Sequence, residues 1–309
     1  MLYTEHIHMD PPYRARLRAC GLDTVAKVLA RVDGRVAAWS RTTDTLFVPG
    51  PDGAPGFYVK RHFFPTWAKR LRGALRGTFF GRHRGLAETQ ALGQMRWVGV
   101  PAVRPVAYGA RRVLHFLAAC FLITEEVPGA VNLTTFADDV RHGRRTLTPG
   151  QRRALRTTLA EQLAHMHLAG CSHGNLFWRN LLVRYGPDGR PEFFFLDPQP
   201  LHSWERLSPG SGWWLRELAQ VMASALPFTT PGERLRFLRR YLGDDHAPEE
   251  LRRQLLQIER LASGWRRHEE RRIRMNGLFE VWNRQLAAEL SRAADASSDT
   301  AFAPPEPAR

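Results

Sequence analysis

The chain has 309 residues, 43% of them hydrophobic, with 25 glycines and 21 prolines, so we expect one or two packed domains and exclude a disordered chain. Its formal net charge is +15, from 45 Lys and Arg against 30 Asp and Glu, which favours a polyanionic partner such as a phosphorylated lipid, a nucleotide or nucleic acid. Lysine occurs only at positions 27, 60 and 69, so each retained lysine is a candidate for a position where arginine would not serve.

The sequence contains no pattern of a membrane span or a secretory signal. Its longest apolar stretch, residues 113–124, is interrupted by His115 and is shorter than the roughly 18 to 20 residues that cross a bilayer. The first residues lack a basic segment followed by an apolar one, so we predict a cytoplasmic protein. The cysteines Cys20, Cys120 and Cys171 have no metal-ligand or disulfide spacing and are predicted to be buried or free thiols.

The N-terminal part is predicted to be rich in strands. Apolar spacing over residues 13–31 predicts a helix broken at Gly21. The period then changes, and three short β-prone runs, with a turn-rich cluster at residues 49–53, predict an antiparallel hairpin region over 36–43, 45–48 and 57–62. A helix through Glu88 and further strands over 100–108 and 113–125 complete this part.

Residues 60–84 carry eight Lys or Arg, no acid and several aromatic residues. This mixture suits contact with an anionic membrane surface or a phosphorylated glycolipid. Nucleic acid would be attracted by the same charge, but it is a weaker alternative because no nucleic-acid-binding motif is visible. A solvated loop and helix face is the third interpretation.

The C-terminal part is predicted to be mainly helical. A helix over 148–170 precedes a hairpin formed by 181–183 and 193–196, and helices follow over 213–226, 233–242 and 248–292. On the last of these, Glu269 with Arg272 and Glu270 with Arg274 have the spacing of ion pairs on exposed helix faces. The prediction is therefore an α+β chain in two lobes, a β-rich N lobe with an N-terminal helix (1–127) and a helical C lobe (128–292), with a disordered tail (293–309).

Four chemically informative elements follow one another in the order of the protein-kinase fold. Lys60 ends a strand, Glu88 lies on the next helix, residues 173–180 (HGNLFWRN) precede an apolar strand, and Asp197 follows another. Phosphoryl transfer from ATP requires a cation on the phosphates, a carboxylate to hold that side chain, and oxygen ligands for Mg²⁺. Lys60 is the predicted phosphate ligand with Glu88 as its partner, and Asn180 and Asp197 are the predicted Mg²⁺ ligands.

Residues 34–243 resemble the lipopolysaccharide kinase (Kdo/WaaP) family, whose fold is protein-kinase-like. The resemblance implies an ATP-dependent, Mg²⁺-dependent kinase at the cytoplasmic face of the inner membrane, acting on a sugar hydroxyl of the lipopolysaccharide inner core (heptose or Kdo) or a similar glycolipid. In such kinases the hinge backbone pairs with adenine, which implies Glu125, Glu126 and Val127 here. The segments that carry the resemblance are 58–62, the helix with Glu88, 98–101, 106–109, 122–126, 173–180, Asp197, 213–218 and 236–242.

The chain departs from the kinase pattern at two places. No G-x-G-x-x-G precedes Lys60, so the hairpin 39–44 would have to cover the phosphates with backbone amides, hydroxyls and Arg41. The position of the usual aspartate base is Asn175, and an amide can orient a hydroxyl but cannot accept its proton at neutral pH. Two alternatives therefore stay open: a nucleotide-binding pseudokinase that regulates an envelope partner, and a small-molecule phosphotransferase of the aminoglycoside-kinase type.

His173, in the segment 173–180, and Glu217, on the helix predicted after it, have two interpretations each. His173 is either a support of the loop backbone, which is favoured, or a catalytic proton acceptor that substitutes for the missing base. Glu217 is either an anchor beneath the loop or an ordinary carboxylate on a helix surface.

Overall fold

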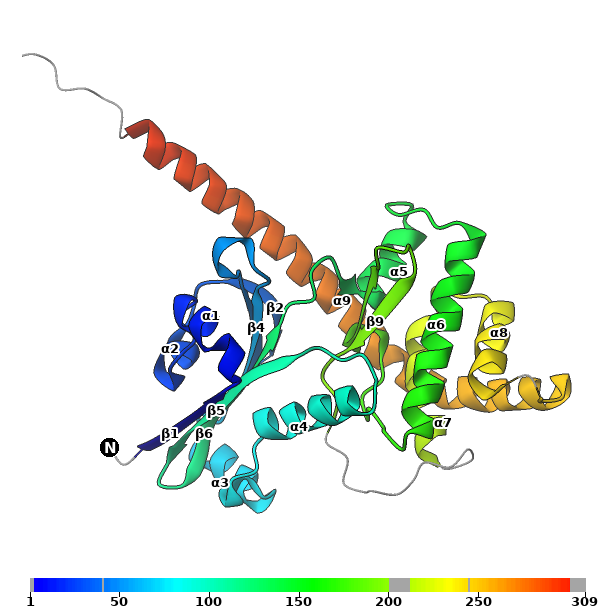
Figure 1. The fold of residues 1–309 in the computed structure, drawn as a ribbon, viewed down its shortest axis with the longest axis horizontal. Helices are drawn as coiled ribbons and strands as arrows, with labels where there is room; N and C mark the ends of the chain where they lie inside the picture. Colours follow the sequence, from blue (N-terminus) through cyan, green and yellow to red (C-terminus); the bar gives the residue numbers. More distant parts are fainter. Residues whose placement is uncertain (1–2, 41, 200–211, 244, 301–309) are drawn as a thin grey trace, which may run out of the picture.

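The computed structural model describes residues 3–40, 42–199, 212–243 and 245–300, and these form a strand-rich N lobe and a helical C lobe (Figure 1). The predicted α+β class with a β-rich N lobe and a helical C lobe is confirmed. In the N lobe the elements are β1 (Tyr3–Met9), η1 (Pro11–Tyr13), α1 (Arg14–Ala19), α2 (Val25–Ala30), β2 (Arg35–Ser40), β3 (Thr43–Val48), η2 (Pro51–Gly53), β4 (Phe57–Phe63), α3 (Trp67–Leu75), η3 (Thr78–Phe80), α4 (Arg84–Trp97), β5 (Pro105–Val113) and β6 (Phe116–Glu125).

The C lobe begins after the segment that follows β6. Its elements are β7 (Val131–Asn132), α5 (Leu133–Arg141), α6 (Pro149–Leu168), η4 (Trp178–Asn180), β8 (Leu181–Tyr185), β9 (Pro191–Phe195), α7 (Gly212–Ala225), α8 (Pro231–Leu242) and α9 (Pro248–Thr300). A small antiparallel sheet β7-β8-β9 lies against these helices. Thr148 begins α6 with a capping box and Pro149 at its first turn, as the sequence predicts.

The N lobe is built on one antiparallel sheet in the order β1-β5-β6-β4-β3-β2. The predicted hairpin region corresponds to β2, β3 and β4, and the predicted break at Gly21 separates α1 from α2. Strand β1 was not predicted, because its half-exposed pattern at the edge of the sheet has no apolar run. The strand predicted over 100–108 begins only at Pro105, and the preceding residues bridge instead to Phe195 in the C lobe.

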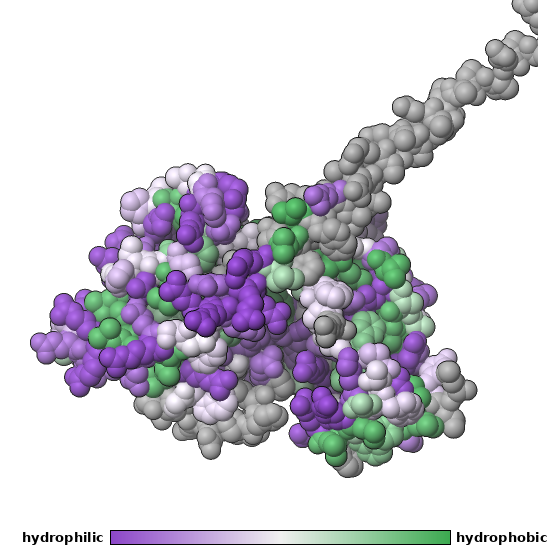
Figure 2. Space-filling model, turned by 180° about the vertical axis from the view of Figure 1, so that it is seen from behind, coloured by the Kyte–Doolittle hydropathy of each residue, from purple (hydrophilic) through white to green (hydrophobic). Residues whose placement is uncertain are grey.

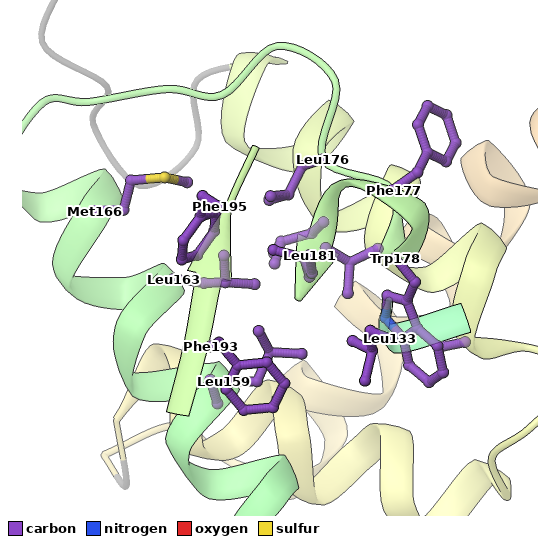
Figure 3. Packing of buried hydrophobic residues seen from close by; sticks show 14 of the residues in the cluster. Leu133, Leu159, Leu163, Met166, Leu176, Phe177, Trp178, Leu181, Phe193 and Phe195 are labelled. Atoms are coloured by element: carbon purple, nitrogen blue, oxygen red, sulfur yellow. The ribbon is translucent and has the colours of Figure 1, made fainter. Parts of the chain in front are cut away.

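The core of the C lobe packs helix side chains onto the small sheet (Figure 3). Leu159, Leu163 and Met166 lie along one side of α6 and face Phe193 and Phe195 of β9. All five are at most 5% exposed, so this packing fixes where β9 ends. The surface seen in Figure 2 is largely hydrophilic, with hydrophobic residues in separate patches, as expected for an arginine-rich chain.

Helix α9 differs from the prediction in two respects. It is one continuous helix to Thr300, so residues 293–300 of the predicted disordered tail are helical, while 301–309 lie outside the described residues. Once a helix has formed, its extension through an alanine-rich sequence costs little free energy, which explains the difference. Second, Glu269 is buried (1% exposed) and does not pair with Arg272 on an exposed face. Glu270 pairs with Arg266 at 2.9 Å.

Candidate active site

Lys60 lies on the central strand β4, between β3 and β6, which holds its backbone on both sides. Its Nζ donates to Glu88 Oε2 at 2.8 Å and to Asp197 Oδ1 at 2.5 Å. Burial alone would lower the pKa of Lys60, but the two carboxylates raise it above its ordinary value. The structure thus brings together three of the predicted site residues, from β4, α4 and the end of β9, around one ammonium group.

Glu88 is positioned by the close approach of α4 to the sheet. A side chain at Gly85 would collide with the backbone oxygen of Phe121 on β6, so glycine lets the first turn of α4 lie against that strand. His83 caps the helix by accepting a hydrogen bond from the Leu86 N–H at 3.2 Å. Burial raises the pKa of Glu88, against the charge of Lys60.

Asp197 follows β9 with a left-handed backbone (φ 57°), which an aspartate tolerates better than most residues. The neighbouring Leu196 N–H donates to the Asn180 carbonyl at 3.0 Å, so the ends of the two segments lie side by side. One carboxylate and one amide are oxygen donors of the kind that bind Mg²⁺ together with substrate phosphates. Within the described residues, no group of three or more His, Cys, Asp or Glu side chains is placed to hold a metal by itself.

Residues 171–180, which we call the catalytic loop, are held from below by one face of α7. Glu217 accepts hydrogen bonds from the Ser172 hydroxyl and from the His173 and Gly174 N–H groups. Gln220 Oε1 accepts from the Leu176 N–H at 2.7 Å, and Ser224 Oγ accepts from the Trp178 N–H at 3.1 Å. A single helix face thereby satisfies four backbone donors of the loop, each of which would be costly to leave unpaired.

The anchoring interpretation of Glu217 is confirmed. The side chain is 1% exposed and also bonds His167 at 2.8 Å. Burial acts to raise the pKa of Glu217, but the hydrogen bonds from His167 and Ser172 hold it below its ordinary value. The carboxylate therefore stays charged where it accepts from the loop.

His173 is fully buried and both of its ring nitrogens bond the backbone. Nε2 donates to the Leu196 carbonyl at 3.0 Å, and Nδ1 accepts from the Asn175 N–H at 3.3 Å. Burial lowers the pKa of His173. This geometry favours the supporting interpretation, since neither nitrogen is left to take a proton from a substrate.

Asn175 occupies the position of the usual base and lies against Asp197. Its Nδ2 donates to Asp197 Oδ2 at 3.1 Å, and its Oδ1 accepts from Arg179 at 3.3 Å. Asn180 Nδ2 donates to the Asn175 carbonyl at 2.7 Å. The side-chain amide is thus fixed at both ends beside a carboxylate and a guanidinium group.

The three predicted adenine ligands, Glu125 at the end of β6 and Glu126 and Val127 after it, differ in their hydrogen bonds. The Glu125 carboxylate accepts from Tyr13 and Arg16 at 2.7 Å, and the Glu126 carboxylate accepts from the Gly56 N–H at 2.7 Å, so both side chains bind protein groups. The N–H groups of Glu125 and Glu126 also donate to backbone carbonyls. The Val127 N–H donates to no backbone group in the described part of the chain, so it is available to a ligand.

The hairpin predicted to cover the phosphates is formed by β2 and β3, which pair from Arg35 with Phe47 to Ser40 with Thr43. Arg41, at its tip, lies outside the described residues.

Residues that support the loop from a distance were not predicted from the sequence. Gln220 and Ser224 follow Glu217 at spacings of three and four, so they share its helix face, and this spacing of polar residues on an otherwise apolar helix was the available signal. Glu269, which contacts both Ser224 and Arg179, gave no such signal because its neighbours are charged.

Comparison with known proteins gives concordant matches. The model of the lipopolysaccharide kinase (Kdo/WaaP) family matches residues 22–241. Lipopolysaccharide core heptose(I) kinase WaaP of Pseudomonas aeruginosa is 31% identical over 191 residues, which are 60% of this chain and 69% of that protein. A solved structure of WaaP in complex with acyl carrier protein superposes with a TM-score of 0.58 at 25% identity, covering 84% of this chain and 98% of that one.

Proposed function

Because the chain belongs to the lipopolysaccharide kinase (Kdo/WaaP) family, we propose that it transfers the γ-phosphoryl group of ATP to a sugar hydroxyl of the lipopolysaccharide inner core, heptose or Kdo, or of a similar glycolipid. The observation that carries this proposal is the placement of Lys60 within hydrogen-bond distance of both Glu88 and Asp197. This arrangement matches what phosphoryl transfer requires of the protein.

In this proposal Lys60 binds the α- and β-phosphates, and Glu88 holds its side chain. Asp197 and Asn180 hold Mg²⁺, which when bound neutralises charge on the phosphates. Lys60 then exchanges its contact with Asp197 for phosphate oxygens. The Val127 N–H is the group that remains to pair with adenine.

Asn175 orients the acceptor hydroxyl in this site without removing its proton. General-base assistance contributes about 10²- to 10⁴-fold in typical enzymes. Most of the catalysis of phosphoryl transfer comes instead from positioning and charge stabilisation, because the transition state is loose. A kinase with asparagine at this position is therefore slower but still active.

The test is transfer of label from ATP to core glycolipid extracted from the source cells, for wild type, Asp197→Ala and Asn175→Asp. We expect incorporation by the wild type and its loss in Asp197→Ala. No incorporation by any of the three, while Mg²⁺-ATP still raises the Tm of the wild type, would favour the pseudokinase. Transfer to aminoglycosides but not to glycolipid would favour the small-molecule phosphotransferase.

We also propose that helix α3 contacts an anionic membrane surface and so places the site beside its glycolipid. Trp67, Leu71 and Leu75 lie at spacings of four along α3 and are 48%, 51% and 90% exposed. Lys69 and Arg72 are exposed on the same short helix. An apolar ridge beside basic side chains suits the boundary between acyl chains and phosphate groups. None of the described helices is long and apolar enough to span a bilayer.

This contact is tested by sedimentation with vesicles of phosphatidylcholine alone or with phosphatidylglycerol. We expect binding that requires the anionic lipid and is weakened in Leu71→Gln/Leu75→Gln. Leu256→Gln, at an exposed leucine of α9 (54% exposed), is the matched control. Equal binding by the α3 variant and the wild type would refute this role.

A third element of the proposal is an acyl carrier protein as partner, since the WaaP structure that superposes on this chain is a complex with one. A cavity of about 140 Å³ lies between α5, α6, α7 and α8, with an apolar lining that includes Phe136, Leu155 and Met222. Arg152 and Arg156 line both this cavity and an adjoining surface pocket. An apolar interior with a basic mouth suits an acyl chain on an acidic carrier. Tighter binding of acylated than of unacylated carrier protein is the expected result.

A further inference from the structure

The guanidinium group of Arg179 is fixed on three sides within the catalytic loop. It lies 4.2 Å from the centre of the Phe177 ring, it donates to Asn175 Oδ1 at 3.3 Å, and it forms an ion pair with Glu269. Its side chain is 17% exposed, so a small part of it still faces solvent. The side chain of Arg179, which is flexible when free, is thereby held in one position. It lies beside the amide of Asn175, which occupies the usual position of the base.

Glu269 comes from α9, 90 residues after Arg179 in the chain. Its carboxylate is 1% exposed and, besides the ion pair with Arg179, accepts a hydrogen bond from Ser224 Oγ at 3.1 Å. A buried carboxylate is stable only when a cation and hydrogen bonds compensate for the water it has lost. Arg179 thus supplies the cation that Glu269 requires. The hydrogen bond from Ser224 connects this ion pair to the α7 face that supports the loop.

Asn175 links this cation to the predicted Mg²⁺ ligand. A carboxylate at position 175 would lie about 3 Å from the carboxylate of Asp197, where two like charges repel each other. The amide avoids that repulsion because it donates to Asp197 and accepts from Arg179. Hydrogen bonds and ion pairs link the side chains of the site in a continuous series: Glu88, Lys60, Asp197, Asn175, Arg179 and Glu269.

We propose that Arg179 is a second catalytic cation, which contacts the phosphoryl group during transfer, and that Glu269 is a positioning residue that holds it there. The acceptor oxygen forms its bond to the γ-phosphorus while the bond from that phosphorus to the bridging oxygen breaks, and ADP leaves with the electron pair. The hydroxyl proton passes to the solvent. Arg179 stabilises the negative charge on the transferred group, so that charge stabilisation compensates for the absence of a proton acceptor at position 175.

This inference rests on the proposed kinase function, and the experiment separates the two. The kcat and the KM for ATP are measured with core glycolipid as acceptor and, separately, with water as acceptor. We expect Arg179→Ala to lower kcat by about 10²- to 10³-fold, with the KM for ATP changed less than about threefold. Arg179→Lys, which keeps the charge, should recover part of the loss, and millimolar guanidinium ion should restore part of the activity of Arg179→Ala but not of Asp197→Ala.

Two variants of neighbouring glutamates on α9 test the positioning role. Glu269→Gln keeps the shape and removes the charge, and we expect kcat to fall about tenfold with an unchanged KM for ATP. Glu270→Gln is the matched control, because Glu270 is 43% exposed and pairs with a side chain of its own helix, Arg266. It should keep the wild-type kcat. The Tm of every variant, with and without Mg²⁺-ATP, shows that it is folded and binds nucleotide.

The inference is overturned if folded Arg179→Ala keeps a kcat within threefold of the wild type, or if neither lysine nor guanidinium ion restores any activity. Equal hydrolysis of ATP by the wild type and Arg179→Ala overturns it without reference to the glycolipid. Failure of the proposed function has a different signature, since it is seen in the wild type alone as an absence of transfer to glycolipid.

Discussion

Lys60 and Glu88 meet in the N lobe through one ion pair, whereas the catalytic loop of the C lobe is held by a row of buried side chains from two helices. In the N-lobe pair, Lys60 would act on a ligand directly and Glu88 holds its side chain. The C-lobe row, Glu217, Gln220 and Ser224 with Glu269 behind them, bonds the loop and would not touch a ligand. The two sets of residues thus differ in role: the first includes a group that would contact the ligand, and the second holds the backbone of the catalytic loop in position. This difference predicts different responses to mutation in the two halves.

The largest effect is expected in the C lobe. Glu217→Ala leaves the Ser172 hydroxyl and the His173 and Gly174 N–H groups without their acceptor in a buried site. We expect the free energy of unfolding to fall by about 3 to 5 kcal/mol, together with a loss of activity. Urea unfolding followed by circular dichroism measures the change. A loss of activity at unchanged stability would show that Glu217 belongs with the chemical residues.

The opposite response is expected of Lys60 in the N lobe. Lys60→Met should lower kcat by about 10²- to 10³-fold, which is about 3 to 4 kcal/mol of transition-state stabilisation. The free energy of unfolding of this variant should change by less than about 1 kcal/mol. Glu88, whose pKa is already raised by burial, can take up a proton when the lysine is removed. Lys27→Met, which removes an exposed pair with Asp23, is the control for activity. Phosphate transfer and urea unfolding on the same samples decide whether the two halves differ.

A smaller effect concerns the cap of α4, the helix that carries Glu88. Burial, assisted by Arg112 and His6, lowers the pKa of His83 to about 4, so the folded protein keeps this ring neutral. The unfolded chain binds the proton more readily, and stability should therefore fall below pH 6.5, by up to about 1.4 kcal/mol per pH unit towards pH 4. His83→Asn preserves a cap and removes the titration, so the Tm should depend less on pH. His115→Asn, at an exposed turn, should keep the wild-type slope.

The residues expected to act on a ligand could be located from the sequence because each lies on or directly after a recognisable element. Lys60 was predicted at the end of a strand and lies at the centre of β4, Asp197 follows β9, and Asn180 ends a short local motif. The order of these elements along the chain was enough to predict that the three residues belong to one site. The antiparallel hairpins and α6 were predictable for the same reason, since their apolar period and their turn residues are local signals.

The supports could not be predicted because they depend on contacts between distant segments. Glu269 is separated from Ser224 by 45 residues, and its charged neighbours gave it the pattern of an exposed face. The backbone of residues 125–127 was predicted beside adenine, but nothing in the sequence indicated that the carboxylates of Glu125 and Glu126 bind Arg16 and the Gly56 N–H, at 109 and 70 residues of separation. Helix α5 has only nine residues, and strand β1 has a half-exposed pattern at the edge of its sheet, so neither gives a long apolar signal.

Helix α9 has a consequence for any attempt to shorten this protein. The part of the chain that matches the family model ends at residue 241, before α9 begins. Leu251, Leu255 and Ile258 of α9 are buried in the C-lobe core, and Glu269 closes the underside of the catalytic loop. A truncated chain that ends at the family boundary would therefore expose that core and leave Arg179 without its counter-ion. The smallest autonomous unit of this protein extends at least one helical turn beyond Glu269.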